Sequence, residues 1–354
     1  MRTNRSASSC KRCTAADVAR RAGVERSTVS RVLNQAFVNH RYDPRTVARI
    51  RDAAAKLGYQ PSLAARSLRA GRSYMLAMVV SDIGNPFFAE MASVVESRAR
   101  SRGYRTLIAN TAEDGKLQAA LLKDLVACGV DGVILSPSGD AGCAELKRRH
   151  VPVVTVDRPL PDHGMSYVGL DNHAAGRMLG EHLRELGYGR VTVLTSGVAD
   201  DPTPDQRYAG LREGLGEGIA VTRWVAGACD VPGAIRKTMD KSRGEQAKHH
   251  AMVGLVNSCT VMALHELLEM NLAIPGDIGV AGIDDFSAAT IFRPAITVVA
   301  QPLTRIAEQA VELLCDAMAG RSAEIKTRLL SPALLVRQSL QRIKPSTTLM
   351  ETEQ

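Results

Sequence analysis

Arginine and hydroxyl side chains are concentrated in one short stretch of the chain, DVARRAGVERSTVSRVL at 17–33. Arg26, Ser27 and Thr28 are consecutive, and Arg31 follows one helical turn later. A guanidinium group can donate two parallel hydrogen bonds to guanine or pair with phosphate, and a hydroxyl can bond to either. These residues therefore predict contact with DNA. The alternative is the solvated face of a short helix, but this face carries almost no acid, which favours DNA.

The charge of the chain is distributed unevenly in a way that supports this prediction. Residues 1–74 contain 16 Lys or Arg and 4 Asp or Glu, a net charge of +12. The other 280 residues contain 29 basic and 33 acidic residues, a net charge of −4. Because phosphate neutralisation requires clustered basic side chains, the asymmetry predicts a nucleic-acid-binding module joined to a domain with another task. A solubilising basic tail is the alternative, but a tail would lack the helical pattern found here.

The spacing of small and apolar residues predicts a helix-turn-helix. The stretch from Thr14 to Asp17 has the form of a capping box that starts a helix. Ala19, Gly23 and Val29 then provide a small residue where two helices cross, a glycine in the turn and an aliphatic anchor in the second helix. In such a module the second helix lies in the major groove, with its first residues against base edges.

A third helix and a short basic segment follow. Asp43 and Pro44 supply an N-cap and a first-turn proline, and Gly58 ends the helix. The segment 61–69, PSLAARSLR, is too short to be stable as an isolated helix, so we expect it to fold only when packed against something. Leu68 could then enter the minor groove as an apolar wedge, although a plain linker remains the alternative.

From Tyr74 onward, short apolar runs such as MLAMVVSDI and VDGVILSP alternate with amphipathic helices. Runs of this kind are typical of parallel strands that helices cover on both faces. We expect an α/β core of two doubly wound subdomains, roughly 75–160 plus 290–320 and 161–290 plus 321–342, with a ligand in the cleft between them. Helices are expected at 86–102, 114–128, 173–187, 204–216, 259–270 and 303–319.

Several functional classes find no support in the sequence. The seven cysteines are scattered and odd in number, which indicates reduced thiols, and Cys10 and Cys13 have no partners to complete a zinc site. We therefore expect no metal and no cofactor. The polar, basic start and the lack of a long apolar run predict a cytoplasmic protein. Because no phosphate-binding loop, zinc-protease or nucleophile-elbow motif occurs, we do not expect an enzyme.

The N-terminal part resembles the lactose repressor family of bacterial transcription regulators, nearly without a gap. TAADVARRAGVERSTVSRVLN and DPRTVARIRDAAAKLGYQPSLAARSLRAGRS carry this resemblance. It implies base contacts by the second helix and a hinge helix over 61–73, whose Leu68 enters the minor groove at the centre of a palindromic operator. The DNA-binding residues to be expected are Thr14, Arg26, Ser27, Thr28, Ser30, Arg31, Asn34, Tyr42, Arg66, Leu68 and Arg69.

Three features of the N-terminal part depart from the family pattern. The loop 35–41 is longer than usual, which changes the backbone contacts expected there. Glu25 stands at the start of the second helix where the family commonly has Ser, and it is both a poorer cap and a negative charge near phosphate. The basic leader 1–13 is also longer than typical, and we expect it to be flexible.

The resemblance continues to about residue 340, through DIGNPFFAEM, VDRPL, VGLDNHAAG, DQRYAGLREG and GIDDF in the expected order. It implies an effector-binding core like that of periplasmic binding proteins. Carboxylates and forked guanidinium donors suit a polyol, with Phe87 or Phe88 against its ring, although ordinary core packing is the alternative for both. Asn257 is included although VNSC at 256–259 replaces the family's Asn-Asp. The effector-binding residues to be expected are Asp82, Asn85, Phe87, Asp157, Arg158, Arg207, Asn257 and Asp284.

These observations predict a DNA-binding transcriptional regulator, a repressor, whose operator affinity depends on a small effector. Short motifs in the core resemble those of regulators that answer to gluconate-type sugar acids, in which Arg207 and Arg158 would pair with the carboxylate. A neutral sugar is the alternative effector, and a sugar-binding module of a transport or sensing system is the alternative function. Since one headpiece makes too few DNA contacts for tight binding, we expect a homodimer. The expected domains are a leader 1–13, a helix-turn-helix domain 14–60, a hinge 61–73, a core 74–342 and a disordered tail 343–354.

Overall fold

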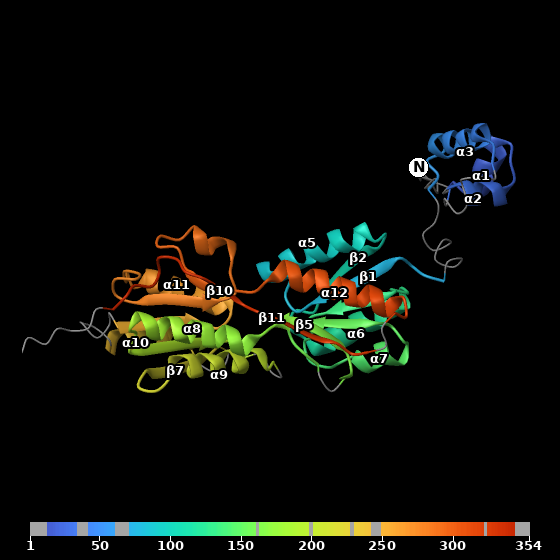
Figure 1. The fold of residues 1–354 in the computed structure, drawn as a ribbon. Helices are drawn as coiled ribbons and strands as arrows, with labels where there is room; N and C mark the ends of the chain where they lie inside the picture. The colour runs from blue at the N-terminus through green and yellow to red at the C-terminus, as the bar shows by residue number, and fades with distance from the viewer. Residues whose placement is uncertain are drawn as a thin grey trace, which may run out of the picture. The chain divides into compact units, whose positions relative to one another are not determined.

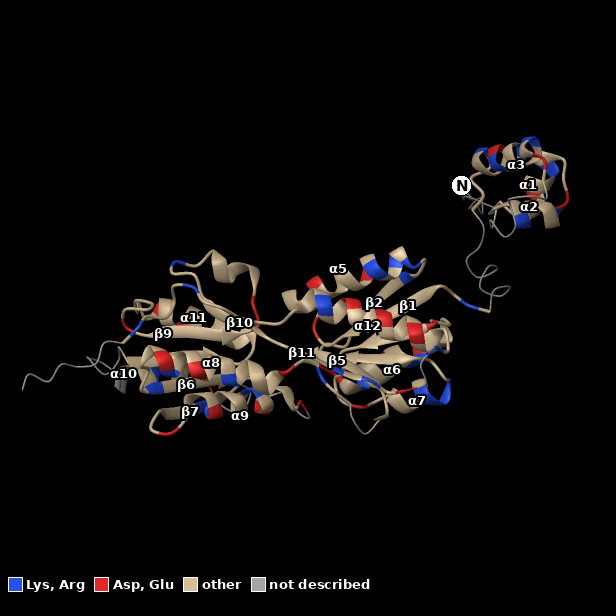
Figure 2. Cartoon of the chain, viewed as in Figure 1, with Lys and Arg blue, Asp and Glu red and all other residues tan. Residues whose placement is uncertain are grey.

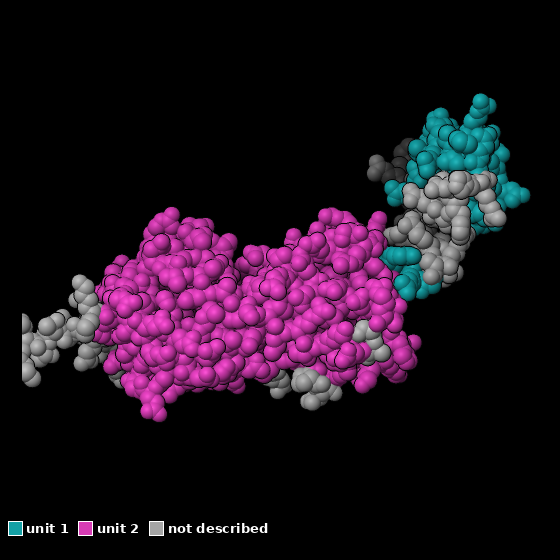
Figure 3. Space-filling view, in the orientation of Figure 1, with its two compact units in different colours: residues 1–74 teal, residues 75–354 magenta. Residues whose placement is uncertain are grey.

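The computed structural model describes residues 13–33, 42–60, 71–160, 163–197, 201–226, 230–241, 249–321 and 324–343. The chain forms two compact units, residues 1–74 and 75–354, which are coloured separately in Figure 3 and are described here as the headpiece and the core. Within the described residues, no helix combines the length and the apolar character that a membrane crossing requires.

The headpiece consists of three helices, α1 (Ala15–Ala22), α2 (Arg26–Leu33) and α3 (Pro44–Lys56), as Figure 1 shows. The Thr14 hydroxyl accepts a hydrogen bond from the Asp17 amide, and the Asp17 carboxylate accepts one from the Thr14 amide, so both halves of the predicted capping box are present. Gly23 has a φ of +64°, which lets the chain turn from α1 into α2. The helix-turn-helix prediction is confirmed.

The headpiece is held together by a small apolar core. Val29 and Val32 of α2 are buried against residues of α1 and α3, among which Val18 and Ile50 are fully buried. At the start of α3, Asp43 accepts a hydrogen bond from the Arg45 amide at 2.9 Å. These contacts fix α2 by its inner face and leave its outer face exposed.

The core contains two six-stranded sheets, with strand orders β11-β5-β4-β3-β1-β2 and β12-β10-β9-β8-β6-β7. All pairings are parallel except that of β12 with β10. The first sheet comprises β1 (Met75–Val80), β2 (Arg105–Asn110), β3 (Gly132–Leu135), β4 (Val153–Val156), β5 (Ser166–Leu170) and β11 (Thr327–Leu330). The second comprises β6 (Arg190–Thr195), β7 (Ala220–Val225), β8 (His250–Gly254), β9 (Gly279–Ile283), β10 (Thr297–Ala300) and β12 (Ala333–Leu335).

Helices cover both faces of each sheet, so the two-subdomain α/β prediction is confirmed (Figure 1). The six predicted helices each begin and end within two residues of a helix in the structure. The first sheet packs against α5 (Pro86–Ser101) and α12 (Leu303–Met318) on one face and α6 (Gly115–Ala127) and α7 (Cys143–Arg148) on the other. The second packs against α8 (Asn172–Leu186) and α9 (Thr203–Leu215), and against α10 (Val231–Lys241), α11 (Asn257–Glu269) and the 3₁₀ helix η3 (Ser287–Thr290).

The chain crosses between the subdomains three times: before α8, between β10 and α12, and between β11 and β12. The predicted boundaries at 160, 290 and 321 are therefore wrong in detail. Residues 166–170 and 327–330 pair within the first sheet, and 297–300 pairs with β9 in the second. The prediction followed order along the chain, whereas hydrogen-bonded pairing decides which sheet a strand joins.

Two helices of the second subdomain pack unusually closely. A Cβ atom on Gly176 of α8 would lie 1.9 Å from the carbonyl oxygen of Arg207, and one on Gly210 of α9 would lie 2.0 Å from that of His173. Only glycine allows backbones to approach in this way. The approach brings the first turn of α8 beside Arg207, which lies in the first half of α9.

Candidate functional site

The outer face of α2 carries the residues predicted to contact DNA. Arg26, Ser27 and Arg31 are exposed, whereas Thr28 and Ser30 are half-buried. Figure 2 marks the positions of the Lys and Arg residues along the headpiece, and exposed arginines occur on all three helices. This face offers hydroxyl and guanidinium donors to a partner, as base and phosphate recognition requires.

Two side-chain contacts modify this face. The Ser27 hydroxyl donates to the Glu25 carboxylate at 3.0 Å, so the residue that departs from the family pattern engages a predicted base-contact residue. The Glu25 carbonyl accepts the first hydrogen bonds of α2, from the amides of Thr28 and Val29. One turn further along the same face, Arg31 donates to the Tyr42 hydroxyl at 3.5 Å, which links α2 to the segment before α3.

The remaining DNA-binding predictions are placed differently. Thr14 is exposed at the start of α1, where its hydroxyl also bonds to the Asp17 carboxylate at 2.7 Å. Asn34, the loop 35–41 and the hinge residues Arg66, Leu68 and Arg69 lie outside the described residues, as do most of the leader and the tail from residue 344.

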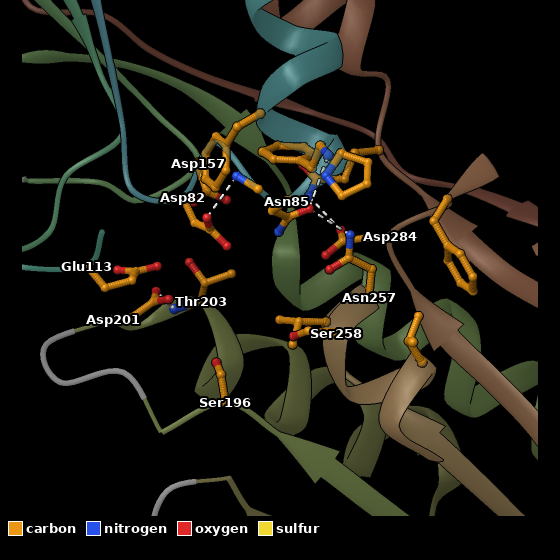
Figure 4. Close-up of a pocket in the computed structure, with 18 of the residues that line it drawn as sticks. Asp82, Asn85, Glu113, Asp157, Ser196, Asp201, Thr203, Asn257, Ser258 and Asp284 are labelled. Carbon is orange, nitrogen blue, oxygen red and sulfur yellow. Dashed lines mark hydrogen bonds between the residues drawn. The ribbon is translucent and has the colours of Figure 1, made fainter. Parts of the chain in front are cut away.

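In the core, one cavity of about 750 Å³ is lined by residues of both subdomains (Figure 4). The structure brings all eight predicted effector-binding residues to its wall. Phe88, the alternative to Phe87 for contact with the ligand ring, also lines it. The other lining residues include several polar and aromatic side chains that were not predicted: Glu113, Ser196, Asp201, Thr203, Ser258, Phe286, Ser287 and Gln301.

The cavity lies where the carboxyl ends of strands from the two sheets meet, as expected for doubly wound sheets. Asp157 directly follows β4, and Asp284 directly follows β9. Both have a positive φ, +64° and +75°, an uncommon backbone conformation that Asp tolerates better than most residues. Asn257 is the first residue of α11, directly beyond the turn that follows β8. The strand ends therefore present carboxylates and amides to one space.

Arg207 is a buried framework residue of the cavity, with a side chain that is only 2% exposed. Its Nε donates to the Asn172 side-chain oxygen at 2.8 Å, and its two terminal nitrogens donate to the Asp284 carboxylate at 2.9 and 3.2 Å. One terminal nitrogen also donates to the Leu255 carbonyl at 2.6 Å. Gln301 adds a donor to Asp284 at 2.6 Å. Arg207 was predicted to pair with a carboxylate of the effector, whereas in the structure its guanidinium pairs with a carboxylate of the protein itself.

Arg158 is likewise surrounded by carboxylates. Its two terminal nitrogens donate to the two oxygens of Glu113 at 2.6 and 2.7 Å, a bidentate pair. Its Nε lies 3.0 Å from a carboxylate oxygen of Asp201 and 3.6 Å from one of Asp157. Burial raises the pKa of Asp157 to about 6, although Arg158 opposes this shift.

Two polar contacts join the subdomains across the cavity. Asn257 of the second subdomain donates to the Asn85 side-chain oxygen at 2.9 Å, and that oxygen also caps α5 by accepting from the Phe87 amide (Figure 4). The second contact is the ion pair between Arg158 of the first subdomain and Asp201, which lies two residues before α9 of the second. A ligand in the cavity can therefore act on the contacts that hold the two subdomains together.

The described parts of the chain contain no group of three or more His, Cys, Asp or Glu side chains placed to hold a metal ion. The His249 and His250 pair does not form a site, because His250 is buried in β8 and bonds to the Thr192 hydroxyl at 2.8 Å. Burial lowers the pKa of His250 to about 4.

Comparison with known proteins agrees with both units. Residues 14–62 match the model for bacterial regulatory proteins of the lacI family, and residues 181–340 match that for a periplasmic binding protein-like domain. The transcriptional regulator KdgR of Bacillus subtilis (strain 168) is 28% identical, with 92% of this chain and 96% of that protein covered. The transcriptional repressor PurR of Pectobacterium atrosepticum is 29% identical, with the same shares covered.

Among solved structures, the lac repressor dimer bound to operator and an anti-inducer has a TM-score of 0.80 at 22% identity, with 94% of this chain and all of that chain covered. At this identity the match establishes the fold. The order of the two matched domains, the near full-length coverage of regulators and the cavity in the core agree with one another. The chain belongs to the lacI family of bacterial regulatory proteins.

Proposed function

We propose that this protein is a transcriptional repressor that binds a palindromic operator, and that a small sugar or sugar-acid effector in the core cavity controls its operator affinity. This proposal rests on the observation that one chain contains two parts with different roles. One is a helix-turn-helix with exposed arginines on its second helix, and the other is a core whose cavity is lined from both subdomains.

The DNA-binding role is assigned to the outer face of α2. Arg26 and Arg31 would each read a guanine edge, and Ser27 would contact a base or a phosphate once it leaves Glu25. Leu68 would act as the minor-groove wedge of the hinge. As a homodimer, two headpieces would read two half-sites related by the molecular two-fold axis.

The effector role is assigned to the cavity because its walls belong to different subdomains. A ligand that contacts Asp82 and Asn85 on one side and Asn257 on the other prefers one arrangement of the subdomains over another. A ligand shifts such an equilibrium only by its difference in affinity for the two arrangements. The contacts that cross the cavity are therefore the elements through which an effector would change operator affinity.

A sugar-binding module of a transport or sensing system is the weaker candidate. It would need only the core, and it leaves the basic headpiece without a task. An enzymatic role is weaker still, since the arginines and carboxylates of the cavity bind one another in the structure. Because the chromosomal target of a bacterial repressor is in the cytoplasm, we assign the protein to that compartment.

The test is a fluorescence-anisotropy titration of the full-length protein against the palindromic sequence upstream of its own gene. We expect tight binding that falls steeply with salt, and a change in that affinity on addition of one compound from a panel of sugars and sugar acids. Leu68→Ser is expected to weaken specific binding far more than binding to random DNA. Weak binding that is indifferent to sequence and to every compound would refute the proposal.

A further inference from the structure

The cavity carries an excess of negative charge. Five carboxylates line it, and within the described residues only two cationic side chains do, Arg158 and Arg207. If all are ionised, this leaves three negative charges in excess. A carboxylate ligand would have to enter a partly buried site of its own sign, where Coulomb repulsion is stronger than in water. The five carboxylates are those of Asp82, Glu113, Asp157, Asp201 and Asp284.

Both cations are already paired with carboxylates of the protein. Arg207 uses four of its five N–H donors on Asn172, Leu255 and Asp284, and it is only 2% exposed. Arg158 is 12% exposed, pairs with both oxygens of Glu113, and has a third donor beside Asp201. A sugar acid would therefore have to displace a protein carboxylate before it could form its own forked pair.

The hydrogen-bonding groups that remain suit hydroxyl groups. One oxygen of Asp82 accepts from the Gly84 amide, and this residue lines the cavity on the first subdomain's side. The Thr203 hydroxyl is buried, lines the cavity and has no hydrogen-bond partner among the described residues (Figure 4). A buried hydroxyl without a partner is costly, and a ligand hydroxyl can satisfy it as donor or acceptor. Phe87 and Phe286 add apolar surface.

Glu113 determines whether the guanidinium of Arg158 can bind a ligand, because it forms a bidentate pair with that group. It follows Ala112 in a turn where both residues have positive φ values, +50° and +59°, and its amide donates to the Ser81 carbonyl at 2.9 Å. The next residue, Asp114, caps α6 through the amides of two following residues. The backbone thus holds Glu113 at the cavity, where its carboxylate accepts two hydrogen bonds from Arg158 as a bidentate pair.

We propose that the effector is an uncharged polyhydroxy compound, and that Glu113 makes the cavity reject the corresponding sugar acid by occupying Arg158. This inference rests on the proposed role of the cavity as the effector site. It narrows the two effector classes left open by the sequence to one, and it identifies a single side chain as the determinant of that choice.

The test is isothermal titration calorimetry of the full-length protein without DNA, using matched aldose and aldonate pairs: ribose, xylose, glucose and galactose with their aldonates. We expect at least one aldose to bind, and its aldonate to bind at least tenfold more weakly. In Glu113→Gln, which retains the size of the side chain but removes its charge, we expect the ratio of aldonate to aldose affinity to rise at least tenfold. Glu217→Gln, in the exposed turn after α9, is the matched control and should leave the ratio unchanged.

Asp201→Asn provides a second variant if Glu113→Gln fails to fold, and it should shift the ratio in the same direction because Asp201 is the other ion-pair partner of Arg158. The inference is overturned if the wild-type protein prefers an aldonate, if no aldose binds, or if neither variant changes the ratio. Operator binding of the same samples, measured separately without sugar, reports on the proposed regulatory function. A protein that binds operator but prefers an aldonate would refute only the effector class.

Discussion

The headpiece and the core use arginine in opposite ways. In the headpiece, Arg26 and Arg31 are exposed on the outer face of α2. The hydrogen bond from Arg31 to the Tyr42 hydroxyl joins a guanidinium to a neutral group. In the core, Arg158 and Arg207 are at most 12% exposed, and both are bound by protein carboxylates. The first pair is presented to a partner, and the second pair forms the walls of a cavity.

The difference shows that residue type and position near a site do not by themselves reveal recognition. An arginine at a strand end beside a cavity looks like a ligand-binding group until the protein's own carboxylates are counted. A buried guanidinium needs a partner because an unpaired buried charge is costly, and here Asp284 and Glu113 supply that partner. Substitutions in the two regions should therefore have effects of different kinds.

The largest effect is expected from Arg207→Ala. Removal of the guanidinium leaves the Asp284 carboxylate buried without its bidentate partner, which should destabilise the core by about 3–5 kcal/mol. Thermal unfolding of the full-length protein, followed through the core transition, measures this. Arg212→Ala, an exposed arginine on the same helix, is the control and should change stability by less than about 0.5 kcal/mol. If the two variants unfold at the same temperature, Arg207 does not serve as a framework residue.

Arg26→Ala should affect DNA recognition rather than the stability of the fold. Since Arg26 is exposed, the headpiece should keep its stability, but discrimination at one base pair per half-site should fall by about 1–3 kcal/mol. Selection of operators from a randomised pool measures this directly. Arg20→Ala, on the exposed side of α1, should weaken all sequences alike if it affects binding at all. An unchanged selected sequence for Arg26→Ala would contradict the assigned contact.

Much of this arrangement could be predicted from the sequence because the signals are local. Capping residues at Thr14 and Asp43, together with helical periodicity, placed all three headpiece helices. Apolar runs ending in Asp, as at Asp157 and Asp284, placed the cavity at strand ends. Each of these signals lies within a few residues of the feature that it predicts.

What could not be predicted depends on contacts between distant parts of the chain. Arg158 and Glu113 are 45 residues apart, and nothing in either neighbourhood indicates their pairing. The rule about strand ends could have included Glu113, which comes shortly after β2, but it could not have shown that this carboxylate would occupy Arg158. The predicted subdomain boundaries were wrong for a similar reason, since β5 and β11 belong to the first sheet through their parallel pairing with each other.

A pH dependence of about 1 kcal/mol is expected from Asp157. Burial raises its pKa from the ordinary 3.8 to about 6, so the folded protein retains a proton that the unfolded chain has lost. This contribution is fully present at acidic pH and is lost as the pH rises through about 6. Between pH 5 and pH 8, wild type should therefore lose about 1 kcal/mol more stability than Asp157→Asn does.

Chemical unfolding at the two pH values measures this difference. Asp205→Asn changes a carboxylate that is 73% exposed and does not line the cavity, and it should behave like wild type. The same pH profile in Asp157→Asn and wild type would show that Asp157 stays ionised in the folded core. That outcome would leave all five carboxylates of the cavity charged and strengthen the case against a sugar-acid effector.

The smallest effect is expected at Glu25, a carboxylate that bonds to Ser27 on the recognition face of the headpiece. Glu25→Ser would place a favourable N-cap at the start of α2 and stabilise the headpiece by about 0.5–1 kcal/mol. It would also remove a negative charge near phosphate and release Ser27 from its hydrogen bond. Affinity for DNA of any sequence should rise modestly, with the larger gain at low salt.

Anisotropy titrations against operator and random DNA at two salt concentrations separate these effects. Glu25→Gln is the matched variant, because it removes the charge without supplying the cap. If both variants tighten DNA binding equally, the charge of Glu25 limits affinity; if only Glu25→Ser does so, the cap and the released Ser27 are responsible. Should neither variant bind more tightly, Glu25 would have no part in DNA contact, and the exposed arginines of α2 would act without opposition from a neighbouring carboxylate.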